Sequence, residues 1–79
     1  MQVEGKIFVI TGTLSKTRRE IAAAITQNGG IMAGAVTSKT DYLVIGRRFG
    51  NTKVSAAFKY GTFTITEEEL AGMLDAKKS

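Results

Sequence analysis

The sequence contains no cysteine, no histidine, no tryptophan and no proline among its 79 residues. The absence of cysteine excludes disulfide bonds and thiolate metal sites. The absence of histidine also excludes the usual zinc ligands and every catalytic mechanism that depends on an imidazole. We therefore expect neither a metal nor a cofactor, and packing alone has to stabilise the fold. The length allows a single domain close to the lower size limit for one hydrophobic core.

Long apolar runs are also absent. No stretch approaches the length of a membrane-spanning helix, and the first residues do not form a charged segment followed by an apolar one, as in a secretory signal. The sequence therefore predicts an intracellular, cytoplasmic protein without a membrane partner. It gives no reason to expect more than a monomer.

Acidic residues are scarce in the first three-quarters of the chain. Residues 1–60 hold nine basic and three acidic side chains, net +6, whereas residues 61–79 hold two basic and four acidic ones, net −2. The total of +4 is modest, and many basic domains of this size bind no anion. The uneven distribution nevertheless favours an anionic partner for the first three-quarters.

Short apolar runs rich in β-branched and aromatic residues alternate with segments of helical periodicity. The runs predict strands at 6–11, 31–33, 42–45 and 62–65. The periodic segments predict helices at 17–28, from a cap at 51 or 52 to a stop at 60–61, and from 66 onward. Buried strands alternating with helices are typical of an α/β fold, a small parallel sheet covered on both faces. We treat 1–79 as one domain with a core at about 4–75 and a tail, 76–79, that we expect to fray.

Helix-capping patterns support these boundaries. The segments 17–20 and 66–69 match the capping box, in which a threonine hydroxyl accepts a hydrogen bond from an amide three residues later and a glutamate reaches back. Asn51 or Thr52 is expected to cap the middle helix, which carries Phe58 on its apolar side.

The carboxyl ends of the predicted strands carry the residues that could bind an anion. In an open parallel sheet, ligands collect at this edge, where loops and helix N-termini meet. Thr11 and Gly12 end the first strand, Lys53 lies in the first turn of the middle helix, and Arg18 begins the first helix. Together they describe a site for one phosphate. Weaker candidates are Thr52, Arg47 and Arg48.

Each of these residues also has a simpler interpretation. Thr11 and Gly12 can serve only to end a strand and begin a turn, and Thr52 can serve only as a helix cap. Lys53 can be an ordinary solvated side chain, and Arg47 with Arg48 can be a solubilising loop pair.

No catalytic group is evident. The segment 46–53 resembles a phosphate-binding P-loop only faintly, because the spacing and the order of its lysine and threonine are wrong. Ser15, Ser38 and Ser55 have no base to activate them, and neighbouring carboxylates occur only at 67–69, where they complement a helix dipole. We therefore expect a chain that is not an enzyme.

Over residues 4–75 the sequence resembles a BRCT domain. The resemblance rests on the motif at 5–12, the glycine pair at 29–30, the motif TSKTDYLV at 37–44 and the motif GNTK at 50–53. The chain is most similar to the C-terminal BRCT domain of bacterial NAD-dependent DNA ligases and to the BRCT domain of the clamp-loader (replication factor C) large subunit. This resemblance implies a four-stranded parallel sheet of order 2-1-3-4, with helices one and three on one face and helix two on the other.

The resemblance also implies a phosphate pocket, which in this subgroup recognises a 5′-phosphorylated DNA end and in other members a phosphoserine. The family's threonine and glycine fall on Thr11 and Gly12, its helix-two lysine falls on Lys53, and the clamp-loader arginine falls on Arg18. The sequence departs from the clamp-loader pattern at Ala56, where that type has a second lysine, and it lacks the tryptophan that many members carry in the last helix.

Two functions follow from this resemblance. The first is a non-catalytic module of a DNA ligase, or of another repair or replication protein, that binds a 5′-phosphorylated or nicked DNA end. The second is an interaction domain for a phosphoprotein or a neighbouring domain. If the parent is an NAD-dependent ligase, its chemistry belongs to other parts of that protein.

Overall fold

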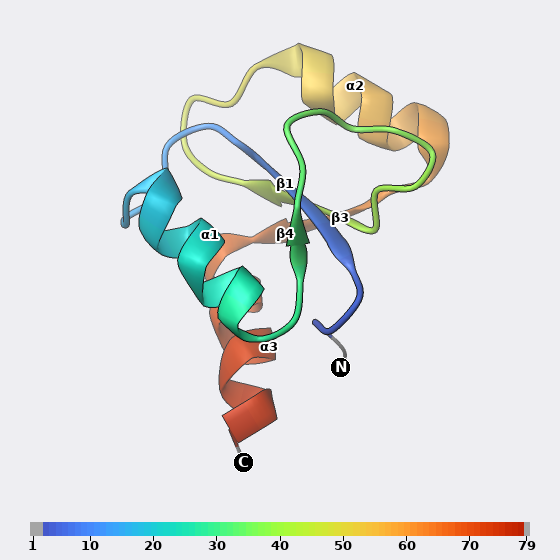
Figure 1. Cartoon of the computed structure of the whole chain (residues 1–79). Coiled ribbons are helices and arrows are strands. Elements are labelled where there is room, and N and C mark those ends of the chain that lie inside the picture. Colours follow the sequence, from blue (N-terminus) through green and yellow to red (C-terminus); the bar gives the residue numbers. More distant parts are fainter. Residues whose placement is uncertain (1–2, 79) are drawn as a thin grey trace.

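The computed structural model describes residues 3–78 as seven elements, labelled in Figure 1. In chain order they are β1 (Ile7–Thr11), α1 (Arg18–Gln27), β2 (Ile31–Met32), β3 (Tyr42–Ile45), α2 (Asn51–Tyr60), β4 (Phe63–Thr66) and α3 (Glu67–Lys78). None of the helices in this part of the chain has the length and apolar character needed to cross a bilayer. Helix α3 continues to Lys78 and Ser79 lies outside the described residues, so fraying of the tail stays a prediction.

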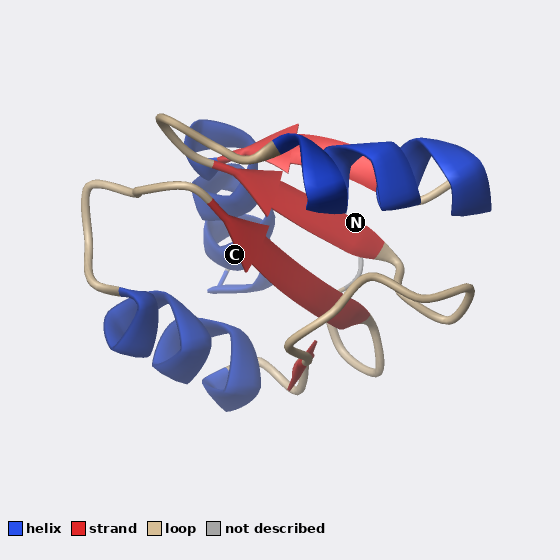
Figure 2. Ribbon diagram, turned by 90° about the horizontal axis from the view of Figure 1, so that it is seen from above, coloured by secondary structure: helices blue, strands red, loops and turns tan. Residues whose placement is uncertain are grey.

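The four strands form one parallel sheet of order β2-β1-β3-β4, as predicted. Strand β1 lies in the interior and pairs with β2 on one side and with β3 on the other. Figure 2 shows α2 on the near face of the sheet and the other two helices beyond it. The predicted three-layer α/β architecture is therefore confirmed.

Alternate residues of the strands supply the two halves of the core. The half between the sheet, α1 and α3 contains Val3, Phe8, Ile10, Ile21, Ile25, Val44, Ile65, Leu70 and Met73. The half under α2 is smaller and contains Val9, Leu43 and Ala57. Because successive side chains of a strand point to opposite faces, Thr11 shares the α2 face of β1 with Val9.

The predicted caps are confirmed at α1 and α3. At α1 the Glu20 amide donates to Thr17 Oγ1 at 3.1 Å, but within the described residues the Glu20 side chain does not reach back to Thr17. At α3 both halves of the capping box are present. The start of α2 differs from the prediction, because Gly50 is the N-cap residue and no side chain caps this helix. Phe58 also differs: its side chain is 92% exposed, since only Val54 and Ala57 of α2 face the sheet.

Candidate functional site

Two loops close the carboxyl edge of the sheet. The loop after β1 (12–17) and the loop after β3 (46–50) are joined by a short antiparallel bridge, in which the Thr13 amide donates to the Arg47 carbonyl at 2.7 Å and the Arg47 amide donates back at 2.8 Å. The Gly46 amide donates to the Thr11 carbonyl at 2.8 Å. The bridge therefore holds the ends of β1 and β3 in a fixed relation.

Glycine is required at this junction. Gly12 has φ +83°, a conformation that side chains with a Cβ rarely adopt, and a Cβ placed there would lie 2.6 Å from the Arg47 carbonyl oxygen. A Cβ at Gly46 would overlap with the Thr13 backbone. The simpler interpretation of Gly12, a turn residue, is therefore sufficient to explain its presence.

Thr11 is unusual among the polar side chains. The buried polar side chains of the described residues are Thr11 and Thr40, each 6% exposed. The Thr40 hydroxyl accepts a hydrogen bond from the Thr37 amide, whereas within residues 3–78 the Thr11 hydroxyl has no hydrogen-bond partner. In the described residues, every fully buried side-chain oxygen or nitrogen has a hydrogen-bond partner. The Thr11 hydroxyl has none, so it must be open to the surface.

The N-terminus of α2 lies at the same edge and on the same face as Thr11. Its first amides, at 51–53, have no intrahelical acceptor and no side-chain cap, so they offer donors and a positive dipole end to an anion. Lys53 stands in this first turn and is half-buried. Thr52 is exposed and is not the cap that the sequence suggested.

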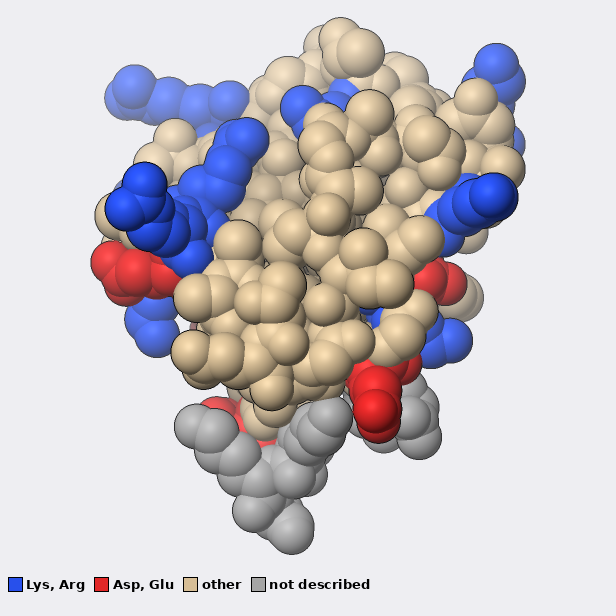
Figure 3. All heavy atoms as spheres, viewed as in Figure 1, with Lys and Arg blue, Asp and Glu red and all other residues tan. Residues whose placement is uncertain are grey.

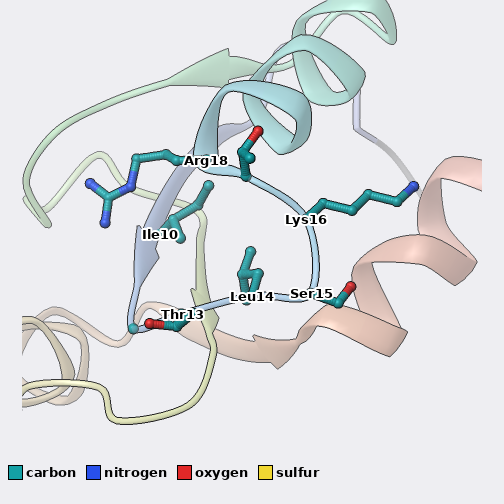
Figure 4. A pocket seen from close by; sticks show the side chains of 8 residues that line it. Ile10, Thr13, Leu14, Ser15, Lys16 and Arg18 are labelled. Carbon is teal, nitrogen blue, oxygen red and sulfur yellow. The ribbon is translucent and has the colours of Figure 1, made fainter.

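Arg18 approaches the edge from the other face of the sheet. It is the first residue of α1, whose buried residues pack in the core half opposite Thr11. A shallow hollow beside it is lined by Ile10 and by residues 12–18, and in Figure 4 the side chains of Arg18 and Lys16 point in opposite directions. The hollow includes Gly12 and Arg18, but Thr11 and Lys53 are not among its lining residues.

Basic side chains gather around this edge. In Figure 3 they cluster at the upper left, over the two loops and the start of α1, and others stand on the right. Blue also shows at the upper centre, whereas the middle of this face is tan; the sequence has an uncharged stretch at 21–38. Arg47 and Arg48 are both exposed, so they are free to serve either solubility or an anionic ligand.

One contact at the site is absent from the sequence-based prediction. The Glu67 carboxylate, at the start of α3, accepts a hydrogen bond from the Ser15 amide at 2.8 Å and another from the Ser15 hydroxyl. These bonds, the hydroxyl's first, lower the pKa of Glu67 below its usual value of 4.5. No short motif predicts a contact between residues 52 positions apart, so no sequence signal could have found it.

Metal binding has no support in the described residues, which contain no group of three acidic side chains that could hold an ion. The candidate groups divide between two faces of the sheet: a threonine hydroxyl, helix amides and a lysine on one side, and a glycine with an arginine on the other.

The sequence matches a known domain family and is similar to a short part of DNA ligases. The family description "BRCA1 C Terminus (BRCT) domain" matches residues 2–74. The chain is 53% identical over 73 residues to a DNA ligase of Aquifex aeolicus and 48% identical over 73 residues to one of Roseiflexus castenholzii. In both cases the match covers 91% of this chain and only 10% of the ligase, so the chain spans about a tenth of these relatives.

The fold is also that of known structures. The C-terminal BRCT domain of human XRCC1 superposes with a TM-score of 0.75 over 95% of this chain and 80% of that one, at 12% identity. The second XRCC1 BRCT domain gives a TM-score of 0.74 at 13% identity, over 95% of this chain and 78% of that one. At such low identity the likeness concerns the architecture alone.

Proposed function

The chain belongs to the BRCT family of non-catalytic modules, and on that premise we propose that it binds the 5′-phosphate of a DNA end or nick. The bound phosphate would accept hydrogen bonds from the Thr11 hydroxyl and from the first amides of α2, with the Lys53 ammonium as its counter-charge. Phosphate contacts of this kind fix position and confer salt dependence without reading sequence.

The observation that carries the proposal is the unpartnered hydroxyl of Thr11. A side chain that is 6% exposed and makes no hydrogen bond within the described residues forgoes a stabilising interaction, unless a ligand supplies it. The hydroxyl lies at the edge where α2 presents uncapped amides, and Lys53 adds a charge there. The proposal assigns these three donors to one anion on the α2 face of the sheet.

The remaining candidates surround this centre. Gly12 would act by shaping the loop beside the phosphate, because the Arg47 carbonyl oxygen occupies the space that its Cβ would need. Arg18, which is assigned by the resemblance to the clamp-loader type, would contact the phosphate or its neighbour from the α1 side. The exposed Arg47 and Arg48 would contact phosphates farther along the strand.

The setting of this activity is a larger protein. Since the curated relatives above are DNA ligases about ten times longer than the chain, we propose that the module holds such a ligase, or another repair or replication protein, at the DNA end. Strand joining would then be carried out by other domains, because a BRCT module is non-catalytic.

The experiment is a titration of the chain with a 5′-phosphorylated duplex and with its dephosphorylated counterpart at several salt concentrations. We expect tighter binding of the phosphorylated end and an affinity that falls as salt rises. Equal affinity for the two ends would contradict the phosphate site, and an affinity independent of salt would contradict DNA binding as a whole.

Two lysines of α2 provide a matched pair of variants. Lys53→Ala removes the charge at the N-terminus of the helix and should reduce the salt dependence by about one phosphate contact. Lys59→Ala removes the same charge from the last turn, at the opposite end, and should leave the preference for the 5′-phosphate intact. A similar loss in both variants would indicate only general attraction to DNA.

A second function, docking of a protein partner, is favoured by a different observation. Phe58, Tyr60 and Phe63 are 92%, 44% and 70% exposed, and they lie within six residues at the C-terminal end of α2 and the start of β4. Phe58 and Tyr60 stand on α2, whereas the Phe63 ring lies beside Tyr42 on the other side of the sheet. Exposed apolar side chains are typical of protein interaction sites. Association that survives nuclease treatment and is lost in Phe63→Ser would favour this function.

A further inference from the structure

Phe49 is an aromatic residue in the loop directly before the N-terminus of α2. The chain has six aromatic side chains, and the large hydrophobics left exposed include Phe49, at 45%. A domain this small depends on its few large apolar side chains for its core, so an exposed phenylalanine in a loop forgoes packing that the fold could use. The other three exposed aromatic residues lie at the far end of α2, which leaves Phe49 isolated from them.

The backbone is fixed both before and after Phe49. Arg47 is bridged to Thr13 by two backbone hydrogen bonds, and Arg48 adopts a positive φ of 53°, which is uncommon for a residue with a side chain. On the other side, Gly50 is the N-cap of α2. Phe49 is therefore held directly before the helix N-terminus, next to two exposed arginines.

This combination of an aromatic ring and cations is the chemistry that recognises nucleobases. A ring stacks on the face of any base, whereas neighbouring arginines attract the phosphate backbone. A base is joined through one sugar to its 5′-phosphate, so a phosphate bound at the start of α2 brings its own base close to the preceding loop residue.

We propose that Phe49 stacks on the base of the 5′-terminal nucleotide whose phosphate is bound at Thr11 and Lys53. The inference rests on the proposed function and makes its ligand more specific. Stacking needs an open face on the terminal base, and a break or gap provides one. At a nick the neighbouring base occupies that face. The preferred ligand is therefore an open 5′-phosphorylated end.

The test uses a blunt duplex with a 5′-phosphate and a second duplex in which the 5′-terminal nucleotide keeps its phosphate but lacks its base. The unaltered chain should bind the first about tenfold more tightly, the lower part of the range for one stacked base. Phe49→Ala should bind the two equally, and Phe49→Trp should retain the preference. Upfield shifts of the Phe49 ring protons on binding would report stacking directly.

Phe58→Ala is the matched control. It also removes an exposed phenylalanine ring, but one near the C-terminal end of α2 and not in the loop before its N-terminus. It should leave the preference for the base-bearing end unchanged. The inference is overturned if Phe49→Ala still prefers the base-bearing end, or if the unaltered chain shows no such preference. In either case, tighter binding of phosphorylated than of dephosphorylated ends still upholds the proposed function. If the unaltered chain does not distinguish those ends, both are overturned.

Discussion

The carboxylate of Glu67 holds Ser15 by two hydrogen bonds, one from its amide and one from its hydroxyl. Ser15 lies in the loop that carries Gly12 and leads to Arg18, and Glu67 begins α3. The contact thus ties one side of the candidate site to a helix that has no other part in it.

The first prediction concerns pH. Because the pKa of Glu67 is lowered in the folded chain, the contact contributes its full stability above the unfolded value of about 4.5 and loses it as pH falls through the lower folded value. Glu67→Gln should be less stable than the unaltered chain near pH 7, and the difference should shrink in acid. Urea unfolding of both chains between pH 7 and pH 3 measures it, and a difference that is constant with pH would contradict the assignment.

The second prediction tests whether the contact positions the site. Glu67→Ala and Glu68→Ala each remove one negative charge from the first turn of α3, which by electrostatics alone would strengthen DNA binding. We expect Glu67→Ala instead to weaken the preference for a 5′-phosphate, because the 12–17 loop loses its anchor, whereas Glu68→Ala should not. Parallel titrations of the two variants with 5′-phosphorylated DNA distinguish anchoring from electrostatics. An equal gain in affinity in both variants would mean that only the charge of these residues affects binding.

The third prediction contrasts two glycines. Gly12→Ala imposes a side chain on a left-handed backbone, at about 1–2 kcal/mol, and adds a contact of 2.6 Å with the Arg47 carbonyl oxygen. Gly72 lies within α3, and a Cβ added there would have nothing within 4 Å. Because glycine destabilises a helix relative to alanine, Gly72→Ala should stabilise the fold by about 0.5–1 kcal/mol. Thermal unfolding should therefore shift in opposite directions, and a shared direction would contradict the described loop geometry.

The fourth prediction contrasts two buried threonines. Thr40→Val removes the acceptor of the Thr37 amide and should cost about 1 kcal/mol or more. Thr11→Val removes a hydroxyl without a partner in the described residues and should change stability by less than about 0.5 kcal/mol. The same change should abolish the preference for the 5′-phosphate, as end-binding titrations would show. A destabilised Thr11→Val chain would favour a purely structural role.

Local patterns account for what could be predicted from the sequence. The capping box at Thr66 and Glu69 involves four consecutive residues, so it was readable before any fold was known. The start of α2 was predicted wrongly because Gly50, Asn51 and Thr52 are all acceptable caps, and the geometry of the preceding loop selects the first.

Contacts between distant segments could not be predicted in this way. The alternation along β1 places Thr11 and Val9 on one face, but only the packing of Ala57 shows that α2 covers that face. The bridge between Thr13 and Arg47 and the exposure of Phe58 likewise depend on how the loops and helices dock. The candidate residues stay a prediction, with Thr11 and Lys53 on one face and Arg18 on the other.

The bridge between Thr13 and Arg47 has a kinetic consequence. Because it joins the loop after β1 to the loop that leads into α2, the proposed site would be assembled before a ligand arrives, and no closing movement would have to precede capture. The rate of encounter is then set by diffusion and by the attraction of the basic edge, and so it falls with ionic strength. Substitutions at the contacting residues should lengthen or shorten the lifetime of the complex and leave its rate of formation almost unchanged.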